Sequence, residues 1–322
     1  MKGFWFSLTI LILAAVLIGC GPAADLADTI PDQYIDTGID ADAWADVPAG
    51  AFPSGQENHL VELDYNYQIM VTDVTNQQYA DYLNQALAAG AIQVGEVEVI
   101  ENENTTLRYG VYGSYPGDPF DDYEHEDPIR AGDKLHFPLE RLGERISFDG
   151  EIFHPVPELA NHPVTMVSWF GAQAYCEYYQ WRLPTELEWE KAARGVEIGP
   201  KGHGQPFPWG YEIERNQANY YSSFDTFERL YGKLGGTTPV GFYNGQTYNG
   251  YQTLDQASPY GLYDMAGNVW QWTGDDYPKQ HYRYLRGGSF YSYEVDLRVW
   301  KRNSAGPTFF APDIGFRCAR DY

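Results

Sequence analysis

The sequence has few basic residues: 21 lysines and arginines stand against 45 aspartates and glutamates in 322 residues, a formal net charge of −24. A surface with this charge repels nucleic acid and anionic lipid, so we expect no nucleic-acid partner. Hydrophobic residues make up 43% of the chain and aromatic residues 16%. A chain of this composition can bury a sizeable core, and it is typical of an acidic globular protein.

Long apolar runs are absent except for one, from Phe4 to Ile18, which follows Lys2 and precedes Gly19 and Cys20. This run is shorter than the about 20 apolar residues that cross a bilayer. A small residue before a cysteine is typical of a lipoprotein signal peptide. We therefore expect a signal peptide over residues 1–19 and a lipid anchor on Cys20, in the cell membrane or outer membrane. An uncleaved N-terminal anchor is the alternative, and both place the remaining chain outside the cytoplasm.

Cysteine is also scarce, with three in the whole chain. If Cys20 carries lipid, only Cys176 and Cys318 remain in an oxidising compartment, and an even pair favours one disulfide. It would close a loop of about 140 residues, for which the chain-entropy model gives a stabilisation of roughly 5 kcal/mol. Two separate buried thiols are the alternative.

The chain divides into regions of different composition. Residues 20–45 are rich in Ala, Asp and Pro without periodicity, and we expect them to form a tether to the membrane. The globular domain is then expected over residues 46–322. Residues 94–160 carry short alternating stretches among Gly, Pro and Asp, which predicts a β-rich insertion within this domain.

Three helices are predicted by their capping residues. Capping boxes begin at Thr75 and at Thr185, and Ser168 precedes a third helical pattern. Gly90 and Gly195 end the first and the last of these helices. Beyond Gly195 helical patterns become rare, which indicates irregular loops and short strands.

Three motifs between residues 163 and 320 resemble those of the formylglycine-generating enzyme family, also called the sulfatase-modifying factor family. They comprise Val167-Ser168-Trp169 with Ala174-Tyr175-Cys176 and Arg182 to Trp189; Tyr260 to Trp272; and Leu285 to Ser289 with Gly315 to Cys318. The resemblance implies an α+β fold, the family's variant of the C-type-lectin-like fold, with little regular secondary structure. It also supports pairing of Cys176 with Cys318.

Structural calcium is a further implication of the resemblance, because family members hold it with oxygen ligands. Gln271 stands where a glutamate is usual. The positions that match two calcium sites are Asp264, Gly267, Val269 and Gln271 for the first, and Asn219 and Tyr220 for the second.

Catalysis is where the sequence departs from the family. Its enzymes oxidise a substrate cysteine to formylglycine with two active-site cysteines that bind copper. Ser292 occupies the position of the first cysteine, three residues after Ser289, and the second has no counterpart. Copper(I) needs soft thiolate ligands, so we expect no copper and no catalytic residue. A formylglycine-generating oxidase or another metal-dependent oxidoreductase is the alternative function.

Other catalytic patterns are absent as well. The seven histidines show no paired spacing, whereas an iron-dependent branch of the fold family requires clustered histidines and carboxylates. Gly235-Gly236 lacks the lysine of a phosphate-binding loop.

Aromatic side chains fill the C-terminal region in place of the missing cysteines. Rings at this density suit recognition of a protein or small-molecule ligand. The same region also resembles the variable region of retroelement-diversified proteins, which implies ligand recognition too. Burial in the C-terminal core is the alternative for these rings. The predicted binding residues are Phe290, Tyr291, Ser292, Tyr293, Trp300, Phe309 and Phe310.

Overall fold

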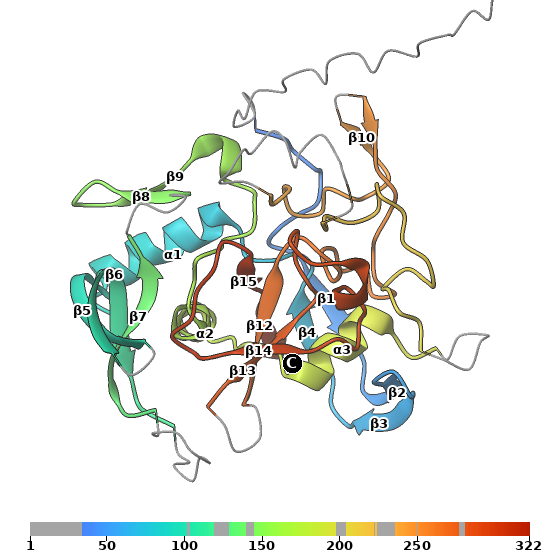
Figure 1. Cartoon of the computed structure of the whole chain (residues 1–322), viewed down its shortest axis with the longest axis horizontal. Helices are drawn as coiled ribbons and strands as arrows, with labels where there is room; N and C mark the ends of the chain where they lie inside the picture. The colour runs from blue at the N-terminus through green and yellow to red at the C-terminus, as the bar shows by residue number, and fades with distance from the viewer. Residues whose placement is uncertain are drawn as a thin grey trace, which may run out of the picture.

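Short strands joined by long loops predominate in the structure, a computed structural model (Figure 1). It describes residues 34–101, 104–118, 129–139, 145–197, 204–221, 223, 236–248, 250–276 and 281–322. The predicted signal peptide and Cys20 lie outside these residues. The α-helices of the described part are α1 (Asn76–Ala88), α2 (Trp169–Tyr178) and α3 (Glu186–Arg194), so the α+β prediction is confirmed.

Each predicted helix begins where its capping residue stands. Thr75 and Thr185 form complete capping boxes with the residue three positions later, and the Ser168 hydroxyl accepts a hydrogen bond from the N–H of Gly171. Gly195 ends α3 with a positive φ of 74°, a conformation that glycine adopts without strain. None of these helices has the length and apolar character that a membrane span needs.

A four-stranded sheet at the centre has the order β14-β13-β12-β15. The Trp272 side chain is fully buried under it, and its indole N–H donates to the carbonyl of Val167, 3.1 Å away. The sheet is therefore joined to the segment that leads into α2. Its strands are β12 (Trp270–Asp276), β13 (Arg283–Arg286), β14 (Asn303–Ala305) and β15 (Ile314–Phe316), with β12 and β15 parallel.

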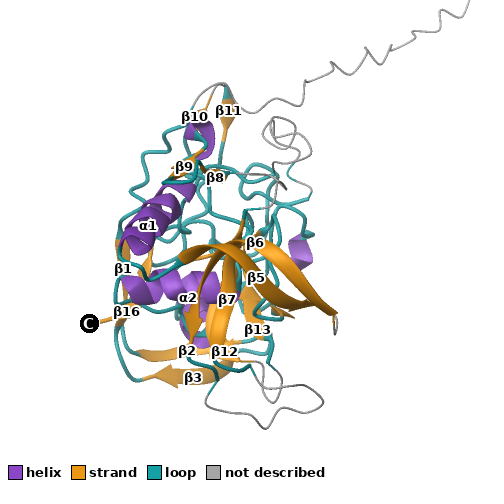
Figure 2. Ribbon diagram, turned by 90° about the vertical axis from the view of Figure 1, so that its left-hand side faces the viewer, coloured by secondary structure: helices purple, strands orange, loops and turns teal. Residues whose placement is uncertain are grey.

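A second sheet brings the start of the packed domain and its end together, in the order β1-β4-β16. Both β1 and β16 pair with β4, and in Figure 2 the two outer strands lie on the side of the molecule where the chain ends. A hairpin connects β1 to β4 along the chain. The strands of this sheet are β1 (Trp44–Val47), β4 (Tyr67–Met70) and β16 (Ala319–Asp321). The hairpin is a separate two-stranded sheet of β2 (Gly50–Ser54) and β3 (His59–Leu63).

The packed domain begins earlier than the sequence predicts. Thr37 is buried, and its hydroxyl donates to the carbonyl of Val240, 2.9 Å away. Trp44 already pairs with Met70 in the second sheet. The tether predicted over residues 20–45 is therefore too long at its C-terminal end, because long-range contacts hold Thr37 and Trp44 in the packed domain.

The region predicted as a β-rich insertion holds a separate sheet and a hairpin, at one side of the molecule (Figures 1 and 2). The sheet packs on α2 so closely that a Cβ at Gly171 would lie 2.4 Å from the carbonyl oxygen of His136. The strands are β5 (Gln93–Glu101), β6 (Asn104–Tyr115), β7 (Gly132–Pro138), β8 (Ile146–Phe148) and β9 (Phe153–Pro155). A small hairpin elsewhere pairs β10 (Thr247–Tyr248) with β11 (Tyr251–Gln252).

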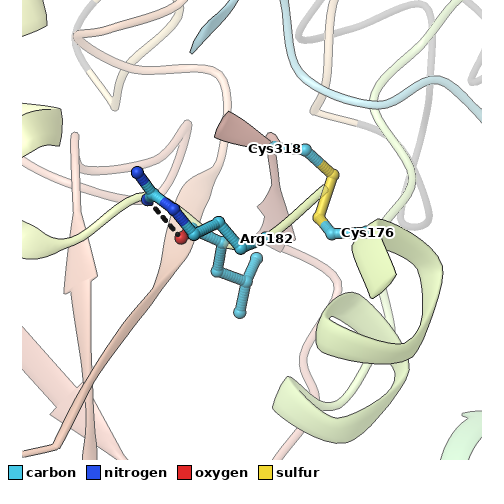
Figure 3. Close-up of a disulfide and its surroundings, with 4 residues drawn as sticks. Cys176, Arg182 and Cys318 are labelled. Carbon is cyan, nitrogen blue, oxygen red and sulfur yellow. Dashed lines mark hydrogen bonds between the residues drawn. A yellow bond between two sulfur atoms is a disulfide. The ribbon is translucent and has the colours of Figure 1, made fainter. Parts of the chain in front are cut away.

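The predicted disulfide between Cys176 and Cys318 is confirmed. It joins the last turn of α2 to the segment between β15 and β16, and Arg182 lies nearby (Figure 3). Arg182 and Ala319 exchange both backbone hydrogen bonds beside it, at 2.9 and 2.7 Å. Because the two cysteines are bonded to each other, neither offers a thiol, and both are fully buried.

Candidate functional site

The site that matches the family's reacting position is shaped by a turn of two glycines after β13. Gly287 and Gly288 have φ values of 94° and 73°. A Cβ on Gly288 would lie 2.8 Å from the Leu297 side chain and 3.0 Å from the carbonyl oxygen of Asp296. Both the conformation and the space therefore require glycine, and the turn directs Ser289 into the site.

Ser289 and Ser292 belong to one hydrogen-bonded group. The Ser289 hydroxyl donates to a carboxylate oxygen of Asp313 over 2.8 Å, and the two serine hydroxyls lie 3.3 Å apart. The Ser292 hydroxyl accepts from the N–H of Ser289 at 3.0 Å. Burial raises the pKa of Asp313, while the hydrogen bond from Ser289 lowers it. Ser292 is thus a buried part of a polar network, where the family's enzymes place a thiol.

A cavity of about 370 Å³ opens over this network. None of its lining residues is a histidine or a cysteine, so it offers no imidazole base for a serine nucleophile. A carboxylate such as Asp313 orients a hydroxyl but has far too low a pKa to deprotonate it. The lining residues are Trp270, Ser289, Tyr291, Ser292, Asp296, Lys301, Arg302, Asn303 and Asp313.

The residues present do not fit copper. Ser292 supplies a hard hydroxyl oxygen at the first cysteine position, and the two cysteines of the described part of the chain are bonded to each other. No soft ligand lines the cavity.

The first predicted calcium position does not fit that ion either. The Gln271 side-chain oxygen already accepts from the Trp189 indole at 2.7 Å and from Arg317 at 2.8 Å. Its amide nitrogen donates to the main-chain carbonyl of Asp264 over 2.6 Å, so both polar atoms of the Gln271 side chain already have protein partners. Both carboxylate oxygens of Asp264 accept protein hydrogen bonds, from Gly241 and Gln256. Burial raises the pKa of Asp264 to about 6.

Gly267 and Val269, which the same prediction assigns as carbonyl ligands, lie in tightly packed backbone. A Cβ on Gly267 would lie 2.3 Å from the carbonyl oxygen of Asn219, and Val269 is fully buried. The backbone of Gly267, from the first predicted calcium position, therefore lies against that of Asn219, from the second. Among the described residues, no group of three or more acidic, histidine or cysteine side chains is placed to hold a metal.

The second predicted position holds one buried oxygen without a partner among the described residues, the side-chain oxygen of Asn219. The Tyr220 carbonyl, the other predicted ligand, accepts hydrogen bonds from the N–H and the hydroxyl of Ser223 at 2.9 and 2.8 Å.

The structure divides the predicted aromatic surface into exposed and packed rings. Phe290 is buried beside Gly236, and Phe310 packs against the cluster of Val97 and Leu135. Trp300 is half-buried, with the Arg194 guanidinium 5.7 Å from its ring centroid. These three rings pack within the protein, whereas Phe309 and two of the predicted tyrosines are exposed.

Three exposed tyrosines lie around the serine network and form what we call the tyrosine patch: Tyr221, Tyr291 and Tyr293. Their exposed fractions are 53%, 55% and 58%. The rings of Tyr221 and Tyr293 are 4.9 Å apart, and the Tyr221 N–H donates to the carbonyl of Ser292. The sequence prediction missed Tyr221, which reaches the site from a distant part of the chain, and Asp313, because it considered only the aromatic residues and Ser292 of that region.

A larger cavity, of about 820 Å³, lies elsewhere, between the insertion and the core. Its two arginines are paired: Arg182 binds Glu188 in two hydrogen bonds of 2.7 Å, and Arg283 binds Asp118. Size alone therefore does not make it the reacting site, since its charges already have protein partners.

Comparisons with known proteins agree with this geometry. Residues 37–322 match the family model described as the sulfatase-modifying factor enzyme 1-like domain. The chain is 36% identical over 183 residues to the serine/threonine-protein kinase Pkn1 of Chlamydia trachomatis serovar L2, covering 51% of this chain and 25% of that one. It is 37% identical over 172 residues to the inactive C-alpha-formylglycine-generating enzyme 2 of Bos taurus, covering 51% and 52%. The chain thus spans a quarter to about half of these curated relatives.

A solved structure shows a similar fold over most of the chain. PvdO from Pseudomonas aeruginosa matches with a TM-score of 0.52 and 20% sequence identity, covering 87% of this chain and 94% of that one. At this identity the likeness concerns the fold alone.

Replacing Gln271 with glutamate tests the fit at the first calcium position. Gln271→Glu removes the N–H donor to Asp264 and adds a buried negative charge, so it should lower the free energy of unfolding by about 3 kcal/mol when calcium is chelated. Added calcium should restore most of this loss. Urea unfolding with a chelator and with calcium measures both effects. Gln77→Glu, on the exposed face of α1, is the control. If calcium raises the free energy of unfolding of the wild type as much as that of Gln271→Glu, the assignment is contradicted.

Proposed function

We propose that this chain, which belongs to the sulfatase-modifying factor enzyme 1-like domain family, is a binding protein that keeps the family fold without the family's oxidation chemistry. The membership predicted from the sequence motifs is confirmed over residues 37–322. The observation that carries the proposal is the site around Ser292. There, Ser292, which stands at the predicted position of the first copper-binding cysteine, belongs to a buried network of hydroxyls and a carboxylate beside exposed tyrosine rings.

The structural roles of the family's signature residues support this proposal. A Cβ on Gly315 would lie 2.5 Å from the carbonyl oxygen of Val164, Arg317 is fully buried, and Cys318 forms the disulfide. Gly287 and Gly288 form the tight turn. These residues are needed for the fold, so their presence is explained without any catalytic step.

The names of the relatives are consistent with the same proposal. One relative of similar identity is named an inactive formylglycine-generating enzyme, so the family includes a member named as inactive. The match to the kinase Pkn1 covers only 25% of that protein, so it gives no reason to propose kinase activity here. An oxidase function has no support from the described residues, because the cavity lining contains no thiol.

The chemistry of the tyrosine patch favours a protein or peptide ligand. Tyrosine rings give large, rigid contact areas and a polar hydroxyl at little conformational cost. The adjoining cavity adds hydrogen-bonding groups, including the Lys301 ammonium, which lies 3.4 Å from Asp296 at a partly exposed pair. A peptide segment has both apolar groups that can contact the rings and polar groups that can bond to the cavity.

For structural calcium, we propose the second position, at Asn219, rather than the first. The support is the buried Asn219 oxygen without a partner among the described residues, and the occupied hydrogen-bonding capacity of Gln271. An oxygen ligand is what Ca²⁺ would take from Asn219.

We further propose that the chain is lipid-anchored outside the cytoplasm through Cys20, as residues 1–20 indicate. Growth of a producing bacterium with radiolabelled palmitate should label the wild-type protein and leave Cys20→Ala unlabelled. Label retained by Cys20→Ala would contradict this anchor.

The tyrosine patch is tested by removing its rings together in Tyr221→Ala, Tyr291→Ala, Tyr293→Ala. Random peptides displayed on phage are first selected on the immobilised wild-type chain. The selected peptides should bind the triple variant at least about tenfold more weakly, because such exposed rings carry much of the binding free energy. Binding is measured by surface plasmon resonance, and thermal melting of the triple variant should stay near that of the wild type.

Tyr34→Ala is the matched control, because it removes a ring that is 53% exposed outside the patch. It should leave peptide binding unchanged. Selected peptides that bind the triple variant as tightly as the wild type, or no enrichment of any peptide on the wild type, would count against the proposal.

A further inference from the structure

A third cavity, smaller than the two described above, lies apart from the serine network, between β1, β4, α1 and α2. Its volume is about 340 Å³, within the range of sites that hold small molecules. It shares no lining residue with the cavity over Ser292. It therefore needs an explanation of its own, independent of the proposed binding function of the tyrosine patch.

Four aromatic side chains, which we call the aromatic cage, form the walls: Trp44, Tyr175, Tyr179 and Trp181. Trp181 stacks on Tyr179 with ring centroids 4.8 Å apart, and it meets Trp44 edge to face at 4.8 Å. The rings of Tyr175 and Tyr179 lie 5.3 Å apart. Four rings from β1, α2 and the segment after α2 thus line one small cavity, and aromatic faces attract a cation.

The polar groups at the cavity are acidic and amidic. Asp42 and Asp81 line it, whereas no lysine, arginine or histidine does so. Asp42 accepts a hydrogen bond from the Gln78 amide at 2.7 Å, and Asp81 accepts one from Gln77 at 3.0 Å. Neither carboxylate forms an ion pair with a basic side chain of the described residues, so two negative charges face the rings.

Two further observations show how charges act on these rings. Burial, the neighbouring Tyr178 and the carboxylates of Asp81 and Asp42 raise the pKa of Tyr179. The Arg320 guanidinium, which does not line the cavity, lies 4.1 Å from the Trp44 ring centroid. The negative potential of the carboxylates thus reaches the cage, and one of its rings already contacts a cation.

We infer that the aromatic cage is a binding site for a small organic cation with a quaternary or fully methylated ammonium group. Such a group has no N–H to donate, so it gains little from hydrogen-bond acceptors and much from aromatic faces. Asp42 and Asp81 add attraction at the rim without contacting it directly. No basic residue lines the cavity itself, and the nearby Arg320 guanidinium contacts Trp44 from outside the lining.

The same charges disfavour a ligand whose ammonium is tied to a phosphate. A phosphocholine group would bring its own negative charge towards Asp42 and Asp81. Free choline should therefore bind more tightly than phosphocholine, and vesicles of phosphatidylcholine should not associate through this site.

The inference is tested by isothermal titration calorimetry of the full chain with choline. Choline should bind with a Kd of about 1 mM or below. Its uncharged carbon isostere, 3,3-dimethylbutan-1-ol, and ethanolamine, which lacks the methyl groups, should each bind at least about tenfold more weakly, since they lose the cation or the fit to the rings. Equal binding of choline and either control would overturn the inference, as would absence of choline binding.

Variants locate the site. Trp181→Leu should weaken choline binding about tenfold, and Asp81→Asn about threefold. Asp81 is exposed on α1, so Asp81→Asn should fold normally even where loss of Trp181 lowers stability. Asp64→Asn removes an exposed carboxylate outside the cavity and should have no effect.

The triple variant of the tyrosine patch should still bind choline, because the two sites share no lining residue. Choline binding that is lost in that variant but kept in Trp181→Leu and Asp81→Asn would overturn the assignment to the cage. Binding of phosphatidylcholine vesicles without binding of choline would do the same.

Discussion

The buried guanidinium of Arg317 ties together the parts of the fold that surround the site. It donates to the carbonyls of Met70 and Val71 at the end of β4, at 3.0 and 3.1 Å, and to that of Tyr263 at 2.7 Å. It also binds Gln271 of the central sheet at 2.8 Å and Asp73 at 3.2 Å. Removing a guanidinium from water is costly unless every donor finds an acceptor. Here five contacts from separate segments offset that cost, so these segments are held in one arrangement.

A second buried group of charges supports the turn of the site from beneath. Arg286, at the end of β13, binds Glu190 of α3 at 2.7 Å and the carbonyls of Val299 and Lys301. Glu190 also binds Arg194 at 2.8 Å. The glycine turn follows Arg286 directly, so its position is fixed by charges that no ligand reaches. Together with the Arg317 contacts, in which the Gln271 oxygen is already an acceptor, these buried charges hold the central sheet and its glycine turn in place.

Local signals in the sequence were enough to predict the helices and the family. Thr75, Ser168 and Thr185 cap their own helices, and the cysteine pair was predicted from its number and from the resemblance. Long-range contacts were not predictable in this way. Trp44 enters a sheet through β4 and β16, so the tether was drawn too long. The rings after Ser289 lie on turns rather than along a strand, so alternation could not separate Tyr291 from Phe290. Tyr221 is far in sequence from Ser292, and Trp44 is far from the other three rings of the aromatic cage, so neither contact could be predicted from local patterns.

We propose that this member of the family binds a ligand and does not oxidise a substrate cysteine. Incubation of the purified full chain with copper, oxygen and a peptide containing Cys-x-Pro-x-Arg tests it directly, with mass spectrometry to detect formylglycine. Because Ser292 stands at the thiol position and Cys176 is bonded to Cys318, the peptide should remain unchanged. Conversion of the peptide cysteine to formylglycine, at a rate that depends on copper, would contradict the account.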